Sequence, residues 1–243
     1  MSEAKLRGEC EAKLRGDLAA LCRLAAKFGW QEATANHISL AVSDDGTQFL
    51  INRRWRDFAT LKASELALLD CNASDLPEDI DSTAWAIHGA IHRLVPQARC
   101  VVHLHPIYAT ALSCLRDPIL YPVDQTSARF FKRVAIDSAY AGMADNRAEG
   151  ERLAKILGKK KILMMGNHGL LSIGESAAEA FDAFYHFERA ARTLMLAYGT
   201  RRKLNVLQDK MAEQTARSWE SEPEFGEAFF AEMRRSLNQD YLD

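Results

Sequence analysis

The segment at residues 99–105, RCVVHLH, constrains the fold of this chain more than any other segment. It is apolar and β-branched, and Pro106 closes it, which predicts a buried strand. Helical spacing precedes it over about 81–94 and follows it over 109–115. Strand-like and helical segments mix along the rest of the chain without a regular alternation or a Pro/Gly-rich linker. This order predicts one α/β domain with a partly antiparallel sheet.

Further segments with helix or strand signals extend this pattern. The turn residues Asp44, Asp45 and Gly46 join two of them into a predicted β-hairpin, and Gly29 and Gly158 end two predicted helices. The remaining residues after the last of these segments form a charged, helix-prone tail. The predicted strands cover 37–43, 48–52, 133–140 and two strands within 161–174, and the predicted helices cover 17–28, 145–158 and 176–198.

The charge balance of the chain argues against one class of function. Its 243 residues hold 31 Lys and Arg against 33 Asp and Glu, a formal net charge of -2, which disfavours a nucleic-acid-binding protein with a broad basic face. No run approaches the roughly 18 apolar residues of a membrane span, and the first residues are charged where a signal peptide would be apolar. The 5 cysteines form no CxxC pair and are interpreted as reduced thiols. We therefore expect a cytoplasmic protein without a membrane partner.

Three histidines are candidates for a metal site. His103 and His105 are separated by one residue in the predicted strand, so their side chains leave the same face of the sheet. His168 is the third candidate, because the glycines on either side of Asn-His let the backbone turn and aim the ring. Three protein ligands with one open position are typical of catalytic zinc. The residues alone leave a second alternative open, a pair of hydrogen-bonded core histidines. Cys100 would project from the opposite face of a regular strand.

Over residues 17–200 the chain resembles the class II aldolase/adducin superfamily. The matching segments occur in the family's order and are DLAALCRLAAKFGW, NHISL, FLIN with LKASELALLD, HGAIHRLVPQARCVVHLHPIYATAL and NHGLLSIG. This resemblance divides the chain into three parts. Residues 1–16, which contain the repeated EAKLRG, are expected to be a charged N-terminal extension, 17–200 the family domain, and 201–243 a helical C-terminal tail.

The resemblance implies both a fold and a cofactor. It implies a single three-layer α/β/α domain with a mostly antiparallel central sheet, and a homotetramer with its sites between subunits. It also implies that the histidines matching His103, His105 and His168 bind a divalent metal. Zinc is the first expectation and iron is the alternative.

The chain departs from the aldolases of this family at one catalytic position. In those enzymes a glutamate precedes the tryptophan of the helix before the His-x-His strand and carries protons, whereas here Ala84 precedes Trp85. A group that moves this proton is commonly worth about 10²–10⁴ in rate. His88 lies one helical turn after Ala84 on the same face, so we expect it to be the catalytic replacement. The alternative for His88 is a structural role, which is also expected of His92.

The resemblance also suggests which residues would bind a substrate. Sugar-phosphate members hold the anion with a Gly-Asn-x-Ser-x-Arg run, of which only the serine remains in NHISLA. A glycine-containing loop of the family is replaced by NRRW, whose arginines would bind a carboxylate or stay in a solvated loop. A phosphate-binding serine pair matches the Ser-Thr that begins the helix at 81–94, where it would serve equally as a cap. The expected substrate-binding residues are Asn36, His37, Ser39, Arg53, Ser82 and Thr83.

Three functions follow from these expectations. The first is a metal-dependent aldolase-like lyase that acts on a small hydroxy-carbonyl or hydroxy-acid compound through a metal-stabilised enediolate. The second is a non-haem iron oxygenase or decarboxylase on the same scaffold, which the missing glutamate would permit. The third is an adducin-like binding or scaffold protein without catalysis. The three retained histidines favour the first over the third, because a scaffold needs no open metal site.

Overall fold

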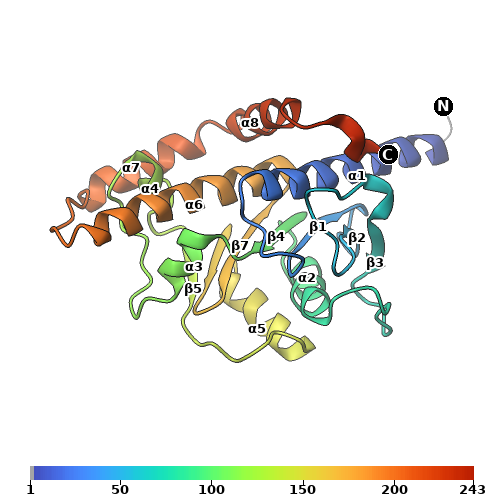
Figure 1. Cartoon of the computed structure of the whole chain (residues 1–243), viewed down its shortest axis with the longest axis horizontal. Coiled ribbons are helices and arrows are strands. Elements are labelled where there is room, and N and C mark those ends of the chain that lie inside the picture. Colours follow the sequence, from blue (N-terminus) through green and yellow to red (C-terminus); the bar gives the residue numbers. More distant parts are fainter. Residues whose placement is uncertain (1–2) are drawn as a thin grey trace.

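One seven-stranded sheet organises the computed structural model, which describes residues 3–243 (Figure 1). The strand order is β3-β2-β1-β4-β7-β6-β5, and all neighbouring pairs are antiparallel except β5 and β6. The predicted α/β class and mostly antiparallel sheet are therefore confirmed, and β3 is added to the predicted strands. The strands are β1 (His37–Ala41), β2 (Gln48–Ile51), β3 (Ala67–Asp70), β4 (Cys100–Leu104), β5 (Val134–Asp137), β6 (Ile162–Met165) and β7 (Gly169–Gly174).

Helices cover both faces of the sheet and so complete the predicted three layers. Figure 1 shows α1, α6 and α8 along one side of the sheet, with α2 and α5 on the other. Two short 3₁₀ helices, η1 (Ala63–Glu65) and η2 (Gln239–Leu242), accompany α1. The α-helices are α1 (Glu3–Lys27), α2 (Ser82–Leu94), α3 (Ile107–Ser113), α4 (Gln125–Ala128), α5 (Arg147–Leu157), α6 (Ala177–Gly199), α7 (Asp209–Glu220) and α8 (Glu224–Arg235).

The alternation of side chains along β1 and β4 separates an apolar face from a polar one. Ile38 of β1 and Cys100 and Val102 of β4 are buried in the main core together with Leu18 of α1 and Phe181 of α6. The intervening residues of both strands face α2, because successive side chains of a strand point to opposite faces. Cys100 thus lies on the face predicted for it, away from the side chain of His103.

The layer between the sheet and α2 contains two separate apolar clusters. It also contains polar residues where the helix faces β1. Ile87 and Ile91 of α2 pack with Val101 of β4 in one cluster, and Phe49 of β2 packs near Ala84 in the other. Where α2 faces β1, the helix carries histidines instead of apolar residues, and these histidines bond to the hydroxyl of a buried serine on β1. Ser39, His88 and His92 therefore form a polar strip across this layer. It lies at the edge of the predicted metal-site histidines.

The two helices of this layer, α2 and α5, approach closely at Gly150. A Cβ atom at Gly150 would overlap the carbonyl oxygen of Ala86 and lie 3.0 Å from the Cβ of Ala90. We expect Gly150→Ala to lower the free energy of unfolding by about 1–3 kcal/mol, because the added methyl forces the helices apart. Gly199→Ala is the matched control, since a Cβ there meets no atom within 4 Å. Chemical denaturation of both variants checks the prediction, and equal effects would contradict it.

The helices after residue 200 pack onto the core. Phe230 of α8 lies 5.5 Å from Phe181 of α6 between ring centroids, and the side chain of Tyr241 is buried in the same cluster. Arg234 of α8 forms an ion pair with Asp17 of α1. The helix α1 is itself continuous across residues 16 and 17, so the predicted boundary there falls inside one helix.

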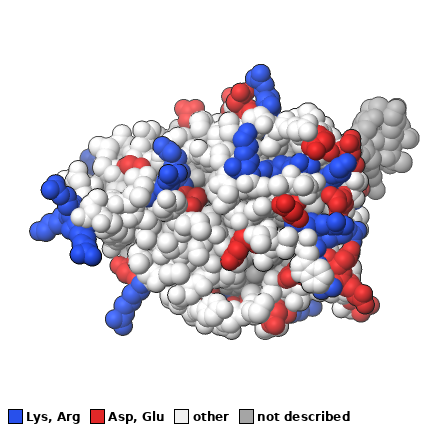
Figure 2. Space-filling view, viewed as in Figure 1, with Lys and Arg blue, Asp and Glu red and all other residues white. Residues whose placement is uncertain are grey.

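The surface carries charges of both signs. On the face drawn in Figure 2, Lys and Arg side chains stand beside Asp and Glu side chains toward the α1 end, and uncharged residues cover most of the centre. Within residues 3–243, no helix has the length and apolar character needed to cross a bilayer.

Candidate metal centre

Three histidines from two chain segments converge at one end of the sheet. His103 lies on β4, His105 directly follows that strand, and His168 lies in the turn between β6 and β7. Each offers a ring nitrogen within 4.8 Å of the other two, and the Nε2 atoms of His103 and His168 are 3.3 Å apart. Among residues 3–243 they form the one group of His, Cys, Asp or Glu with this geometry. We call these residues the histidine triad.

The backbone of the β6–β7 turn brings His168 to the end of β4. Asn167 adopts a φ of 55°, in the left-handed region that permits a tight turn. At Gly169 a Cβ atom would lie 2.8 Å from the carbonyl oxygen of Leu104 and 2.5 Å from the ring of His105. Only glycine allows this close approach of the turn to β4. The left-handed conformation of Asn167 and the absence of a side chain at Gly169 together bring His168 to the end of β4.

Hydrogen-bond partners on the far side of two rings leave their Nε2 atoms free to bind a cation. The Nδ1 of His103 lies 3.1 Å from the carbonyl oxygen of Leu170, an atom that can only accept, so the proton is on Nδ1 and Nε2 is unprotonated. The Nδ1 of His105 lies 2.5 Å from a carboxylate oxygen of Glu32, which fixes that ring in the same way. Such partners commonly orient metal-binding histidines.

Burial keeps the rings of His103 and His168 neutral. Burial, with a smaller contribution from His105, lowers the pKa of His168 to about 4, and burial lowers the pKa of His103 well below its usual value. A neutral imidazole with a free Nε2 is the form that binds zinc or iron. The donor set of the histidine triad therefore fits a divalent cation.

The histidine triad opens into a cavity of about 190 Å³. Its wall is formed by the loop before β1, the start of α2, the end of β2 and the loop after β5. The lining residues are Thr34, Ala35, Asn36, His37, Asn52, Arg54, Asp81, Thr83, Ala84, Ile87, His103, His105, Tyr140, Gly142, Met143, Ala144 and His168. Ala84, at the position where the resemblance implies a glutamate in the aldolases, lines the cavity, and its methyl side chain offers no proton-transferring group.

A fourth histidine, His37, borders both the cavity and the polar strip. It pairs with His103 across β1 and β4, and the two ring centroids are 5.0 Å apart. The Nδ1 of His37 lies 2.8 Å from the Nε2 of His88. Burial lowers the pKa of His37 to about 3 and holds the pKa of His88 well below its usual value, so both rings are neutral.

The structure separates the predicted site residues into two sets. Asn36, His37 and Thr83 line the cavity, although the amide of Asn36 bonds to the backbone of Glu32 and the hydroxyl of Thr83 donates to Asp81. These two side chains therefore also hold the cavity wall in place.

The other predicted residues do not line the cavity, for different reasons. His88 has no exposed surface and touches the site only through His37. The hydroxyl of Ser39 points to His88 and away from the cavity. Arg53 forms an ion pair with Asp79, and Ser82 is exposed at the first position of α2, which Asp81 caps.

Sequence reasoning missed two residues of the site and left a third, Arg54, undecided between anion binding and a solvated loop. Arg54 lines the cavity in place of its neighbour, and its guanidinium lies 4.2 Å from the centre of the Trp55 ring. Asp81 also lines it, and its signal in the sequence was that of a helix cap. Glu32 lies in an exposed loop, where no motif distinguishes it from other surface carboxylates.

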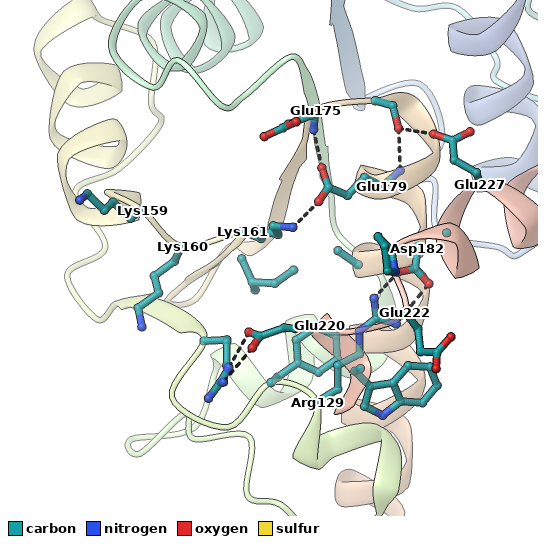
Figure 3. A pocket seen from close by; sticks show the side chains of 18 residues that line it. Arg129, Lys159, Lys160, Lys161, Glu175, Glu179, Asp182, Glu220, Glu222 and Glu227 are labelled. Carbon is teal, nitrogen blue, oxygen red and sulfur yellow. Dashed lines mark hydrogen bonds and ion pairs between the residues drawn. The ribbon is translucent and has the colours of Figure 1, made fainter. Parts of the chain in front are cut away.

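A larger cavity of about 600 Å³ lies between α6, the turn joining α7 to α8, and residues 159–161 (Figure 3). Its charged side chains largely neutralise one another. Arg129 pairs with Asp182, and Lys161 pairs with Glu179. This cavity contains no histidine, and among residues 3–243 none of its carboxylates belongs to a group with metal-ligand geometry. The smaller cavity beside the histidine triad is therefore the better candidate for chemistry.

Comparison with known proteins identifies the family. The family model described as "Class II Aldolase and Adducin N-terminal domain" matches residues 16–195. The chain belongs to this family. The predicted resemblance is thereby confirmed, and the family includes both aldolases and adducins.

Three similar proteins illustrate the range of this family. A proposed class 2 aldolase of Caulobacter vibrioides is 34% identical over 212 residues, which cover 86% of this chain and 82% of that protein. Gamma-adducin of Mus musculus is 32% identical over 188 residues, 74% of this chain and 26% of the adducin. The crystal structure of an aldolase II superfamily protein from Pseudomonas syringae is 30% identical with a TM-score of 0.85, and 96% of each chain is covered.

Proposed function

We propose that this protein is a divalent-metal-dependent, aldolase-like lyase that acts on a small hydroxy-carbonyl or hydroxy-acid compound. The observation that carries the proposal is the histidine triad, in which the Nδ1 atoms of His103 and His105 are bonded to acceptors and the Nε2 atoms converge. A bound cation, zinc in the first instance, would supply Lewis-acid stabilisation of negative charge that develops on substrate oxygens.

The cavity dimensions and one of its charged groups support the proposed substrate class. Its volume of about 190 Å³ is well below the range of about 300–1,000 Å³ that drug-sized ligands occupy. Arg54 supplies a guanidinium on the wall, and this group binds a carboxylate or phosphate well. A compound of a few carbon atoms with adjacent oxygens and one anionic group fits these limits.

Next to the histidine triad, His37 is a cavity side chain placed to exchange a hydrogen bond with the substrate. It lines the cavity and contacts His103, whereas the side chain of Ala84 has no polar atom and His88 is fully buried. We therefore assign the contact with substrate to His37, and His88, expected from the sequence to be catalytic, supports it from behind.

Turnover by metal-loaded protein tests the proposal. The wild-type chain, loaded with zinc or with ferrous iron under anaerobic conditions, is assayed for carbon–carbon bond cleavage on a panel of short hydroxy-ketones, hydroxy-acids and their phosphates. We expect turnover of at least one compound, with His103→Ala reducing it by about 10²-fold or more through loss of the cation. No turnover across the panel, together with no effect of His103→Ala on metal content, would reject the proposal.

Two other outcomes separate the remaining functions. Oxygen consumption with iron but not zinc would indicate the oxygenase or decarboxylase alternative. A protein that is purified without metal and does not take up added zinc or iron would support an adducin-like binding role, which the absence of a carboxylate at Ala84 and the similarity to gamma-adducin favour.

A further inference from the structure

One buried carboxylate of α6 caps a different helix, α3. The two oxygens of Glu188 accept the backbone N–H groups of Tyr108 at 3.0 Å and of Ala109 at 2.7 Å. Both N–H groups belong to the first turn of α3, which has no side-chain cap next to it in the sequence because Pro106 precedes it. Glu188 lies about 80 residues after this turn. The start of α3 is therefore fixed by a residue distant in the sequence.

The other end of α3 is bonded to the turn that carries His168. The backbone N–H of Asn167 donates to the carbonyl oxygen of Ser113, the last residue of α3, at 3.1 Å. Asn167 directly precedes His168. At the start of the helix, only Pro106 separates α3 from His105. The helix α3 thus connects two members of the histidine triad, one at each end.

The helix α3 is too short to hold its position alone. It has seven residues, whereas isolated helices shorter than roughly 12–15 residues are marginal in water. Ala109 and Leu112 are buried in the main core with Phe184 of α6, but apolar burial is not directional. Hydrogen bonds do depend on direction. The two bonds from Glu188 therefore determine how the first turn of α3 lies against α6.

The position of this first turn matters for the geometry of the histidine triad. His105 lies between β4, which is held by pairing with β1 and β7, and α3. Its ring centroid is 4.9 Å from that of His168. A displacement of the start of α3 would move the backbone of His105, and a displacement of its end would move the turn before His168. Both changes alter how the ring nitrogens converge.

We propose that Glu188 is a positioning residue for the metal site and that α3 transmits its effect to His105 and His168. Glu188 does not line the cavity, so it acts through the helix and not on a substrate. The consequence for metal binding rests on the proposed function. The link from Glu188 through α3 to the β6–β7 turn does not require a metal, and it can be measured without one.

Amide hydrogen exchange of the metal-free full chain, followed by NMR, tests this link. Glu188→Gln keeps the size of the side chain but replaces one acceptor oxygen by an NH₂ group, which would face a backbone donor. We expect the amides of Tyr108 and Ala109 to exchange roughly tenfold faster. The amide of Asn167, which Glu188 does not contact, should exchange faster by about threefold or more, because its bond to Ser113 opens together with α3.

Two further variants separate the role of the hydrogen bonds from a general loss of stability. Glu188→Asp keeps the charge but is one methylene shorter, so we expect faster exchange at the same three amides. Asp182→Asn is the matched control, because Asp182 is a similarly buried carboxylate of α6 that pairs with Arg129 and His186 and not with α3. Unchanged exchange at Asn167 in both folded Glu188 variants, or an equal increase in Asp182→Asn, would overturn the proposal.

Zinc affinity distinguishes a failure of this proposal from a failure of the proposed function. At a temperature where all variants are folded, we expect Glu188→Gln to bind zinc about tenfold more weakly than the wild-type chain, and Asp182→Asn to bind it equally well. Unchanged zinc affinity in Glu188→Gln would overturn the positioning role and leave the metal-dependent function standing. A wild-type chain that takes up no zinc would reject the proposed function, while exchange at Asn167 still decides whether α3 carries the link.

Discussion

His105→Ala is expected to weaken zinc binding by roughly a hundredfold or more, because it removes one of only three protein ligands of the proposed site. Glu32→Gln should weaken it by about 10–100-fold, although Glu32 does not belong to the histidine triad. The carboxylate of Glu32 holds the proton of His105 on Nδ1 and turns Nε2 toward the other two rings. A glutamine retains the shape of the side chain but is a weaker acceptor.

Competition between the protein and a zinc chelator, followed by calorimetry, measures both effects. Glu222→Gln is the matched control, since it also removes an exposed carboxylate but lies in the other cavity. We expect its zinc affinity to equal that of the wild-type chain. Equal affinities for Glu32→Gln and Glu222→Gln would show that Glu32 has no part in orienting the ligand.

The largest stability effect is expected at Phe230, in the region predicted from the sequence to be a tail. Phe230→Ala should lower the free energy of unfolding by about 3–5 kcal/mol, because it removes a buried ring that packs against Phe181. Phe225→Ala is the matched control on the same helix, and Phe225 is 39% exposed. Denaturant unfolding of both variants measures the two changes in the free energy of unfolding. A cost at Phe230 no greater than that at Phe225 would mean that α8 adds little to the core.

Much of the fold follows from local patterns in the sequence. The hairpin of β1 and β2, the strand β4 and the helix α6 all have strong periodicity and clear turn or cap residues. The strand β3 was missed because its sequence, ALLD, has no β-branched residue and leaves Leu68 45% exposed. Its conformation depends on pairing with β2, which a local pattern does not reveal.

The candidate site could be predicted only in part, because local patterns also do not reveal its long-range contacts. His103, His105 and His168 were found because strand alternation and a glycine turn are local signals. The difference between Arg53 and Arg54 depends instead on the ion pair of Arg53 with Asp79, a residue distant in the sequence. The burial of His88 likewise depends on contacts with β1. Long-range contacts therefore decided which of the candidate side chains reach the cavity.

The contact of η2 with α1 has a consequence for biosynthesis. Tyr241 is buried in the same core as Leu18, and Asp17 pairs with Arg234, so partners of the first helix are encoded more than 200 residues after it. At a synthesis rate of about 5–20 residues per second, α1 waits roughly 10–45 s for these partners. During that interval its apolar face is available to chaperones, and we expect nascent chains truncated before α8 to bind them longer than the full-length chain does.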